Sequence, residues 1–135
     1  MNFDLQREKV EQVQQILREV DIDVWLVWVR ETSQMADPVL ELIYGGEFVW
    51  QSALLFQRDG KPIAIVGNFD SDATKATGLF GGVISYTKSI KDALMGELTR
   101  LSPEKVAINF SKSNVAADGL SHGMYLILNE YLAGS

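Results

Sequence analysis

The only histidine of the chain, His122, lies four residues after Asp118, a spacing that can place both side chains on one face of a helix. Such a pair could bind a metal ion or exchange a proton with a substrate. One histidine and no cysteine exclude a zinc site built from several His or Cys ligands, and they exclude a thiol nucleophile. We therefore favour a structural interpretation, in which Asp118 begins a helix and His122 lies in its first turn.

Two further groups could carry chemistry. Asp70 and Asp72 could hold a metal ion or act as an acid and a base, but they precede a short helical segment. Carboxylates at a helix start accept hydrogen bonds from free backbone N–H groups, so the sequence predicts capping there. The glycine pairs at 45–46 and 81–82 lack the additional spaced glycines of a nucleotide-binding loop, and they predict turns.

Arg30 directly follows the apolar segment 24–29. Ligands of open α/β sheets gather at the carboxyl ends of strands, and a guanidinium suits a carboxylate there. The alternative is a solvated loop arginine. We expect Trp25 in the core, whereas Trp28 and Trp50 lie close to a strand end and a strand start, where one of them could contact a ligand at a rim.

The elements that position these residues follow from the spacing of apolar side chains. Helices are predicted around residues 8–20, 71–76, 90–101 and 120–131, and strands over 24–29, 48–57, 62–67, 82–86 and 105–110. Asp59 and Gly60 predict a hairpin turn between the second and third strands. The expected fold is α/β, a mixed five-stranded sheet with helices on both faces. We expect the order 3-2-1-4-5, with the second strand antiparallel to the first.

Composition excludes other classes of protein. The 135 residues, of which 47% are hydrophobic, suit one domain spanning residues 1–135. A net charge of -6 offers no electrostatic source for nucleic-acid binding. The polar N-terminus is no signal peptide, and no apolar run approaches the roughly 18 residues of a membrane span. We expect a soluble cytoplasmic domain without a nucleic-acid or membrane partner.

The order of these segments resembles a known family. The leading helix, the strand over 24–29, the glycine pair at 45–46 and the hairpin at 58–60 resemble the N-terminal domain of the creatinase/prolidase/aminopeptidase P family. The strand over 105–110, followed by Asn-Val-Ala-Ala-Asp-Gly-Leu-Ser at 114–121, adds to this resemblance. It covers essentially the whole chain and rests on order and spacing.

The resemblance implies a part of a larger enzyme. Members are two-domain metallopeptidases that cleave bonds next to proline, or relatives such as creatinase that hydrolyse a C–N bond. Two divalent metals (Mn, Co or Zn) lie in a C-terminal pita-bread domain, held by two Asp, one His and two Glu, and that domain is absent from this chain. The N-terminal domain has a ribonuclease H-like motif, holds no metal ligand, forms dimers and helps to shape the substrate entrance.

The implied function is therefore that of a non-catalytic N-terminal domain of an Xaa-Pro dipeptidase or aminopeptidase. Its partners would be its own catalytic domain and a second copy. Arg30 and Trp50 would face the substrate entrance, with residues 30–37 at a domain or subunit boundary. A nuclease needs carboxylates on the central strands to hold two metals, and residues 24–29 contain none. A stand-alone regulatory or small-ligand-binding α/β domain stays open as the alternative.

Overall fold

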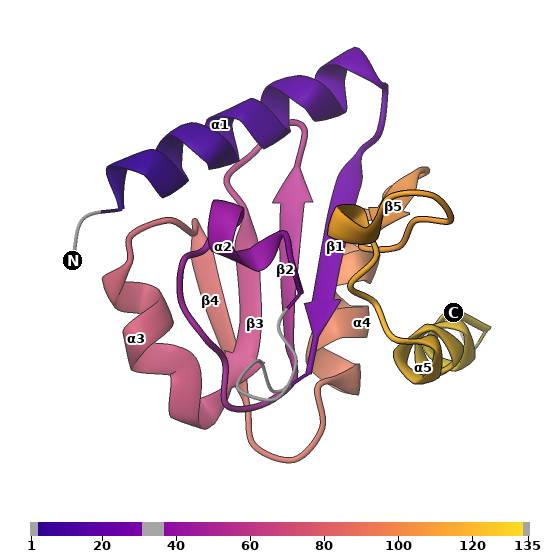
Figure 1. Cartoon of the computed structure of the whole chain (residues 1–135). Helices are drawn as coiled ribbons and strands as arrows, with labels where there is room; N and C mark the ends of the chain where they lie inside the picture. The colour runs from indigo at the N-terminus through magenta and orange to yellow at the C-terminus, as the bar shows by residue number, and fades with distance from the viewer. Residues whose placement is uncertain (1–2, 31–36, 134–135) are drawn as a thin grey trace.

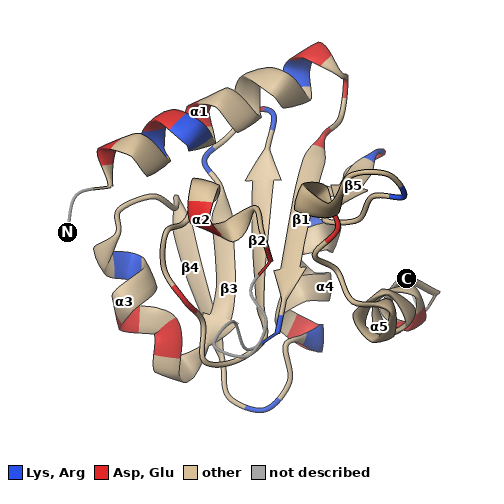
Figure 2. Cartoon of the chain, viewed as in Figure 1, with Lys and Arg blue, Asp and Glu red and all other residues tan. Residues whose placement is uncertain are grey.

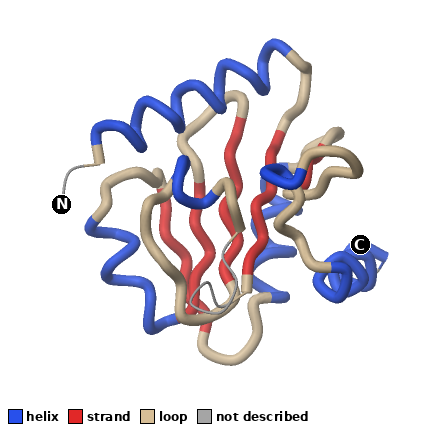
Figure 3. The backbone as a smooth tube through the Cα atoms, viewed as in Figure 1, coloured by secondary structure: helices blue, strands red, loops and turns tan. Residues whose placement is uncertain are grey.

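The computed structural model describes residues 3–30 and 37–133, so most of the loop predicted over 30–37 lies outside the described residues. A five-stranded sheet carries helices on both faces (Figures 1 and 3). The helices are α1 (Asp4–Glu19), α2 (Leu40–Ile43), α3 (Ser71–Ala76), α4 (Lys91–Leu101) and α5 (His122–Ala133), with short 3-10 turns η1 (Asn68–Asp70) and η2 (Val115–Ala117). The strands are β1 (Val24–Val29), β2 (Ser52–Gln57), β3 (Ile63–Gly67), β4 (Gly82–Tyr86) and β5 (Val106–Ile108). The α/β fold class is confirmed.

The strand order is β4-β3-β2-β1-β5, and β2 is antiparallel to both of its neighbours. The pairs β1–β5 and β3–β4 are parallel. Therefore β1, β3, β4 and β5 all end, and β2 begins, at one end of the sheet, which we call the carboxyl end. The predicted interior position of β1 and its antiparallel pairing with β2 are confirmed.

The predicted order 3-2-1-4-5 is wrong in the place of β4. Instead of pairing with β1, β4 pairs in parallel with β3, from Ile63 opposite Gly82 to Gly67 opposite Tyr86. The connection from β3 contains only η1 and the six-residue α3, so it returns the chain to the strand position beside β3. The free side of β1 is then taken by β5, which follows the longer α4.

The sheet separates two apolar clusters. One lies under α1 and α2 and contains Val27 and Val29 of β1, and the other lies under α4 and α5 and contains Leu26 and Trp28. Strand β1 is therefore buried on both faces, as its continuous apolar sequence predicts. No helix in the described part of the chain is long and apolar enough to cross a membrane.

The burial of two tryptophans differs from what the sequence predicts. Trp28 is fully buried and its ring lies 5.8 Å from that of Tyr131 in α5, so the rim position considered for it is wrong. Trp25, expected in the core, is only half-buried, with its ring 5.3 Å from that of Phe56. The reason is the alternation of a strand, which turns Trp28 to the face that α5 covers.

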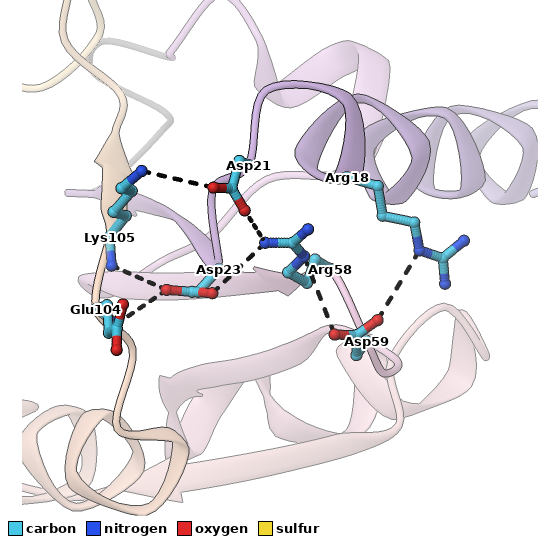
Figure 4. Close-up of polar contacts among 7 residues, drawn as sticks. All are labelled: Arg18, Asp21, Asp23, Arg58, Asp59, Glu104 and Lys105. Carbon is cyan, nitrogen blue, oxygen red and sulfur yellow. Dashed lines mark hydrogen bonds and ion pairs between the residues drawn. The ribbon is translucent and has the colours of Figure 1, made fainter.

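At the opposite end of the sheet, charged side chains join three connections (Figure 4). The carboxylate of Asp23 accepts hydrogen bonds from the backbone N–H groups of Glu104 and Lys105, each at 2.9 Å. Arg58, in the predicted hairpin turn, donates to Asp21 at 2.6 Å. This hydrogen bond, together with the charges of Lys105 and Arg58, holds the pKa of Asp21 below its ordinary value. The network ties the start of β1 to the β2–β3 hairpin and to the start of β5.

Candidate functional site at the carboxyl end of the sheet

Both residues that the sequence singles out for ligand contact lie at the carboxyl end of the sheet. Arg30 follows Val29, the last residue of β1, and Val29 lies opposite Ser52, two residues after Trp50. The guanidinium of Arg30 is at the surface beside the first turn of α5, where a Cβ on Gly123 would lie 3.3 Å from its Nη2. The permanently charged, planar guanidinium of Arg30 thus directly follows a strand that is buried on both faces.

Trp50 is 36% exposed, and its ring packs against residues at the ends of β3 and β4. Its ring lies 6.0 Å from that of Tyr86, at the end of β4. It also lies directly on Gly67, where any side chain would overlap the indole. Because Gly67 has no side chain, the indole can lie against the end of β3 while Trp50 stays partly exposed.

Asp70 holds the backbone that carries Trp50. Its carboxylate is buried and accepts hydrogen bonds from the N–H groups of Val49, at 3.0 and 3.1 Å, and of Trp50, at 3.2 Å. The predicted capping role of this side chain is wrong, because it makes no hydrogen bond to its own helix. The same contacts explain why β2 begins at Ser52 rather than at residue 48. The sequence gives no sign of this contact, because Asp70 and Trp50 are 20 residues apart.

A second buried carboxylate, Asp37, follows Arg30 by seven residues. Asn109 donates from Nδ2 to Asp37 at 2.7 Å and to the carbonyl oxygen of Trp28 at 3.0 Å. Asp37 also accepts from the N–H of Val39 at 2.9 Å. Sequence reasoning missed this cluster; the aspartate two residues before Val39 was the available signal, because aspartates commonly form such local turns.

Asp118 and His122 do not lie on one helix, because Asp118 follows η2 and α5 begins at His122. Asp118 accepts a hydrogen bond from the N–H of Ser111 at 3.2 Å, so it does not begin the helix as predicted. His122 is exposed and is the first residue of α5, which confirms its predicted place in the first turn. Within residues 3–30 and 37–133, no three His, Asp or Glu side chains are grouped so that they could hold a metal ion.

The sequence analysis also missed Phe69, whose ring is 74% exposed in η1, next to the buried Asp70. Together with Arg30 and Trp50, it adds an exposed ring to the guanidinium and the indole at this end of the sheet. These groups suit the binding of a carboxylate and of apolar side chains. We call Arg30, Trp50 and Phe69 the carboxyl-end site.

Comparisons with known proteins identify the fold. No family model and no curated protein matches the sequence. The creatinase/prolidase N-terminal domain of an X-Pro dipeptidase from Streptococcus pyogenes superposes with a TM-score of 0.64 at 16% identity, over 96% of this chain and 99% of that one. The N-terminal domain of Xaa-Pro dipeptidase from Lactobacillus brevis has a TM-score of 0.63 and 20% identity, over 93% and 86%.

Longer proteins match in the same way. X-Pro aminopeptidase from Thermotoga maritima has a TM-score of 0.68 at 15% identity, over 92% of this chain and 31% of that one. The chain likewise spans 31% of the Xaa-Pro dipeptidase from Bacillus anthracis. At these identities the likeness shows the fold, which is that of the creatinase/prolidase N-terminal domain.

Proposed function

We propose that this chain acts as the non-catalytic N-terminal domain of an Xaa-Pro dipeptidase or aminopeptidase. It contributes to dimerisation and helps to shape the substrate entrance of a metal-dependent catalytic domain. The fold supports this proposal, since the similar solved structures are an N-terminal domain of an X-Pro dipeptidase and longer proteins named as Xaa-Pro peptidases, of which this chain spans about a third. The protein would act in the cytoplasm, with no nucleic-acid or membrane partner.

The carboxyl-end site is the observation that carries the entrance role. Arg30 presents a planar cation that can pair with the terminal carboxylate of a short peptide in two hydrogen bonds. The buried neighbours of the site fix its position, because Asp70 holds the backbone of Trp50 and Asp37 holds the end of β5 through Asn109. The site therefore binds and orients a peptide, and it leaves the bond cleavage to the catalytic domain.

In this proposal, the catalytic domain binds two divalent metals (Mn, Co or Zn), which would activate water there. The described residues of this chain do not fit such a pair, because they contain no group of three His, Asp or Glu side chains suited to a metal. We assign no metal ligand and no catalytic residue to this chain.

The test uses the full-length peptidase. Arg30→Ala is expected to raise KM for short peptides about tenfold while kcat stays near the wild-type value, because a charge-assisted contact to bound substrate is lost. The matched control is Arg100→Ala, an exposed arginine on α4 that pairs with Glu97. Wild-type KM and kcat in Arg30→Ala would show that this segment is only a connector.

One observation favours the alternative, a stand-alone ligand-binding domain. A cavity of about 490 Å³ lies between α1 and the β2–β3 hairpin, and Arg7, Phe56, Lys61 and Leu79 contribute to its lining. The two cations of the lining outnumber its one carboxylate, Glu11, so the cavity suits a small carboxylate with an apolar body. Calorimetric binding of such a carboxylate to the chain in the absence of any catalytic domain would favour this function.

A further inference from the structure

The first half of α1 stands away from the β2–β3 hairpin and leaves a cavity between them (Figure 1). Arg7, Val10, Glu11 and Gln14 follow the spacing i, i+3, i+4, i+7, so they share one face of α1. This face forms one wall of the cavity, and the hairpin forms the opposite wall. Its volume of about 490 Å³ is within the range of small-molecule sites.

The inner wall of the cavity is apolar. Phe56 of β2 and Leu79 are 1% and 6% exposed, and both belong to the apolar cluster under α1 and α2. Val10 packs against the same cluster from α1, and Pro62 is buried in the hairpin. An apolar group that enters the cavity therefore leaves water and contacts side chains that the core holds in place.

Two cations of the lining lie against the connection from α3 to β4. Nη1 of Arg7 pairs with Asp4 at 2.9 Å, while its Nη2 lies 3.5 Å from where a Cβ on Gly78 would be. The stem of Lys61 packs along Gly81, where an added Cβ would lie 2.7 Å from the Cβ of the lysine. These cations can receive a carboxylate on this side of the cavity.

One carboxylate and two amide oxygens also line the cavity. Within residues 3–30 and 37–133, Glu11 forms no ion pair. Gln14 and Gln57 each donate from Nε2 to a backbone carbonyl of the hairpin, Gly60 at 3.2 Å and Lys61 at 2.7 Å. Their amide nitrogens are thus directed to the backbone, which leaves Oε1 as an acceptor. Carboxylate and amide oxygens suit an ammonium group.

Charges of opposite sign therefore face the cavity from its two walls. Figure 2 shows both signs of charge along α1 and basic residues on the β2–β3 hairpin. Glu11 of α1 and Lys61 of the hairpin form no ion pair with each other in the described chain, although both line the cavity. A ligand with a single charge pairs with only one of them, whereas a zwitterion pairs with both.

We propose that this cavity binds a zwitterionic amino acid with an apolar side chain. Its carboxylate lies near Lys61 and Arg7, and its ammonium group lies near Glu11. Its side chain packs on Phe56 and Leu79, which are the apolar part of the lining. For a ligand as small as leucine, a Kd of about 0.1–1 mM is expected.

The inference rests on the alternative function, ligand binding, and names the ligand of that cavity. The cavity is distinct from the carboxyl-end site, because the β2–β3 hairpin lies where β2 ends and β3 begins, at the opposite end of the sheet. Binding there is therefore independent of the entrance role of Arg30.

Backbone ¹H–¹⁵N NMR spectra of the 135-residue chain test the proposal by titration with three ligands. L-leucine carries both charges, N-acetyl-L-leucine lacks the ammonium group, and L-leucinamide lacks the carboxylate. We expect leucine to shift the amide signals of Gly60, Lys61 and Gly78 and to leave that of Arg30 in place. Each derivative should bind with a Kd at least about tenfold higher, because it loses one charge-assisted contact.

A variant separates the ammonium contact from general effects on the cavity. Glu11→Gln should raise the Kd of leucine about tenfold and change that of N-acetyl-L-leucine by less than about twofold, since the latter has no ammonium group. The matched control is Glu19→Gln, which makes the same change at an exposed position of α1 outside the cavity. It should leave both Kd values unchanged. The spectra themselves show whether each variant is folded.

The outcomes distinguish this inference from the function on which it rests. N-acetyl-L-leucine that binds as tightly as leucine overturns the zwitterionic ligand but leaves a carboxylate-binding cavity. An equal effect of Glu11→Gln on both ligands overturns the ammonium contact and with it the proposal. Amide signals that stay unchanged at about 20 mM of all three ligands overturn both the inference and the alternative function. The KM test of Arg30 is unaffected by any of these results.

Discussion

Two buried carboxylates determine where the exposed side chains of the carboxyl end lie. Asp70 and Asp37 are only 6% and 4% exposed, and both carboxylates accept hydrogen bonds from backbone N–H groups or a side-chain amide. A buried carboxylate satisfied in this way fixes the loop that donates to it. At the scale of residues, the position of Trp50 is thus set by a side chain that no ligand touches.

The first prediction concerns Asp70. Asp70→Ala leaves the N–H groups of Val49 and Trp50 without this acceptor, and it should lower the free energy of unfolding by about 2–3 kcal/mol. Urea denaturation followed by fluorescence measures the loss. The control, Asp72→Ala, removes an exposed carboxylate in the first turn of α3 and should cost no more than about 0.5 kcal/mol. Equal losses in the two variants would contradict the role of Asp70.

The second prediction compares two glycines. A Cβ on Gly119 would overlap the carboxylate of Asp37, so Gly119→Ala must displace Asp37 from Asn109. A loss of about 1–3 kcal/mol is expected. Gly96, within α4, has open space around a Cβ, and Gly96→Ala should stabilise the fold by about 0.5–1 kcal/mol. Thermal unfolding should show Tm shifts of opposite sign, and a neutral Gly119→Ala would contradict the contact.

At the scale of elements, the two ends of the sheet carry different kinds of side chain. The carboxyl end presents the guanidinium and aromatic rings of the candidate site. The other end is joined by the ion pairs of Figure 4, which link the α1–β1 turn, the β2–β3 hairpin and the α4–β5 connection. Exposed ion pairs contribute modestly one by one, but here they connect three turns that are distant in sequence.

The third prediction uses the lowered pKa of Asp21. Because this pKa is lower in the folded chain than in the unfolded one, its contribution to stability is complete above about pH 4 and is lost as the pH falls through the folded value. Asp21→Asn removes the contribution, and asparagine tolerates the φ of +57° at this position. The stability difference between wild type and variant should be constant from pH 5 to 7 and should shrink below pH 4.

Urea denaturation across this pH range measures the difference. The control is Glu8→Gln, an exposed carboxylate on α1 for which the described residues show no ion pair. Its difference from wild type should be small at every pH. A difference for Asp21→Asn that is the same at pH 3 and pH 7 would contradict the role of the Arg58 contact.

At the scale of the whole molecule, the chain has a candidate binding surface at the carboxyl end of its sheet and a cavity between α1 and the β2–β3 hairpin. Neither of them contains the ligands of a dinuclear metal centre in the described part of the chain. The fourth prediction is that the isolated chain neither hydrolyses Xaa-Pro peptides nor binds Mn²⁺ tightly, because too few ligands can gather around an ion. Calorimetry that shows stoichiometric, submicromolar Mn²⁺ binding would contradict it.

The sequence by itself determined the elements of this protein. Apolar spacing located the first helix and the last one, and the Asp59-Gly60 pair located the hairpin. The uninterrupted apolar run of β1 predicted a strand buried on both faces, because each of these signals is carried by neighbours a few residues apart. The position of Arg30 at the end of this strand followed from the same local pattern.

Only the tertiary structure decided how distant segments meet. The place of β4 beside β3 depends on how far a short crossover reaches, and the burial of Trp28 depends on where α5 packs. Asp70 and Asn109 find their partners 20 and 81 residues away, respectively. Local propensity contains no information about such contacts, because they arise only when packing of the apolar faces has brought the strands together.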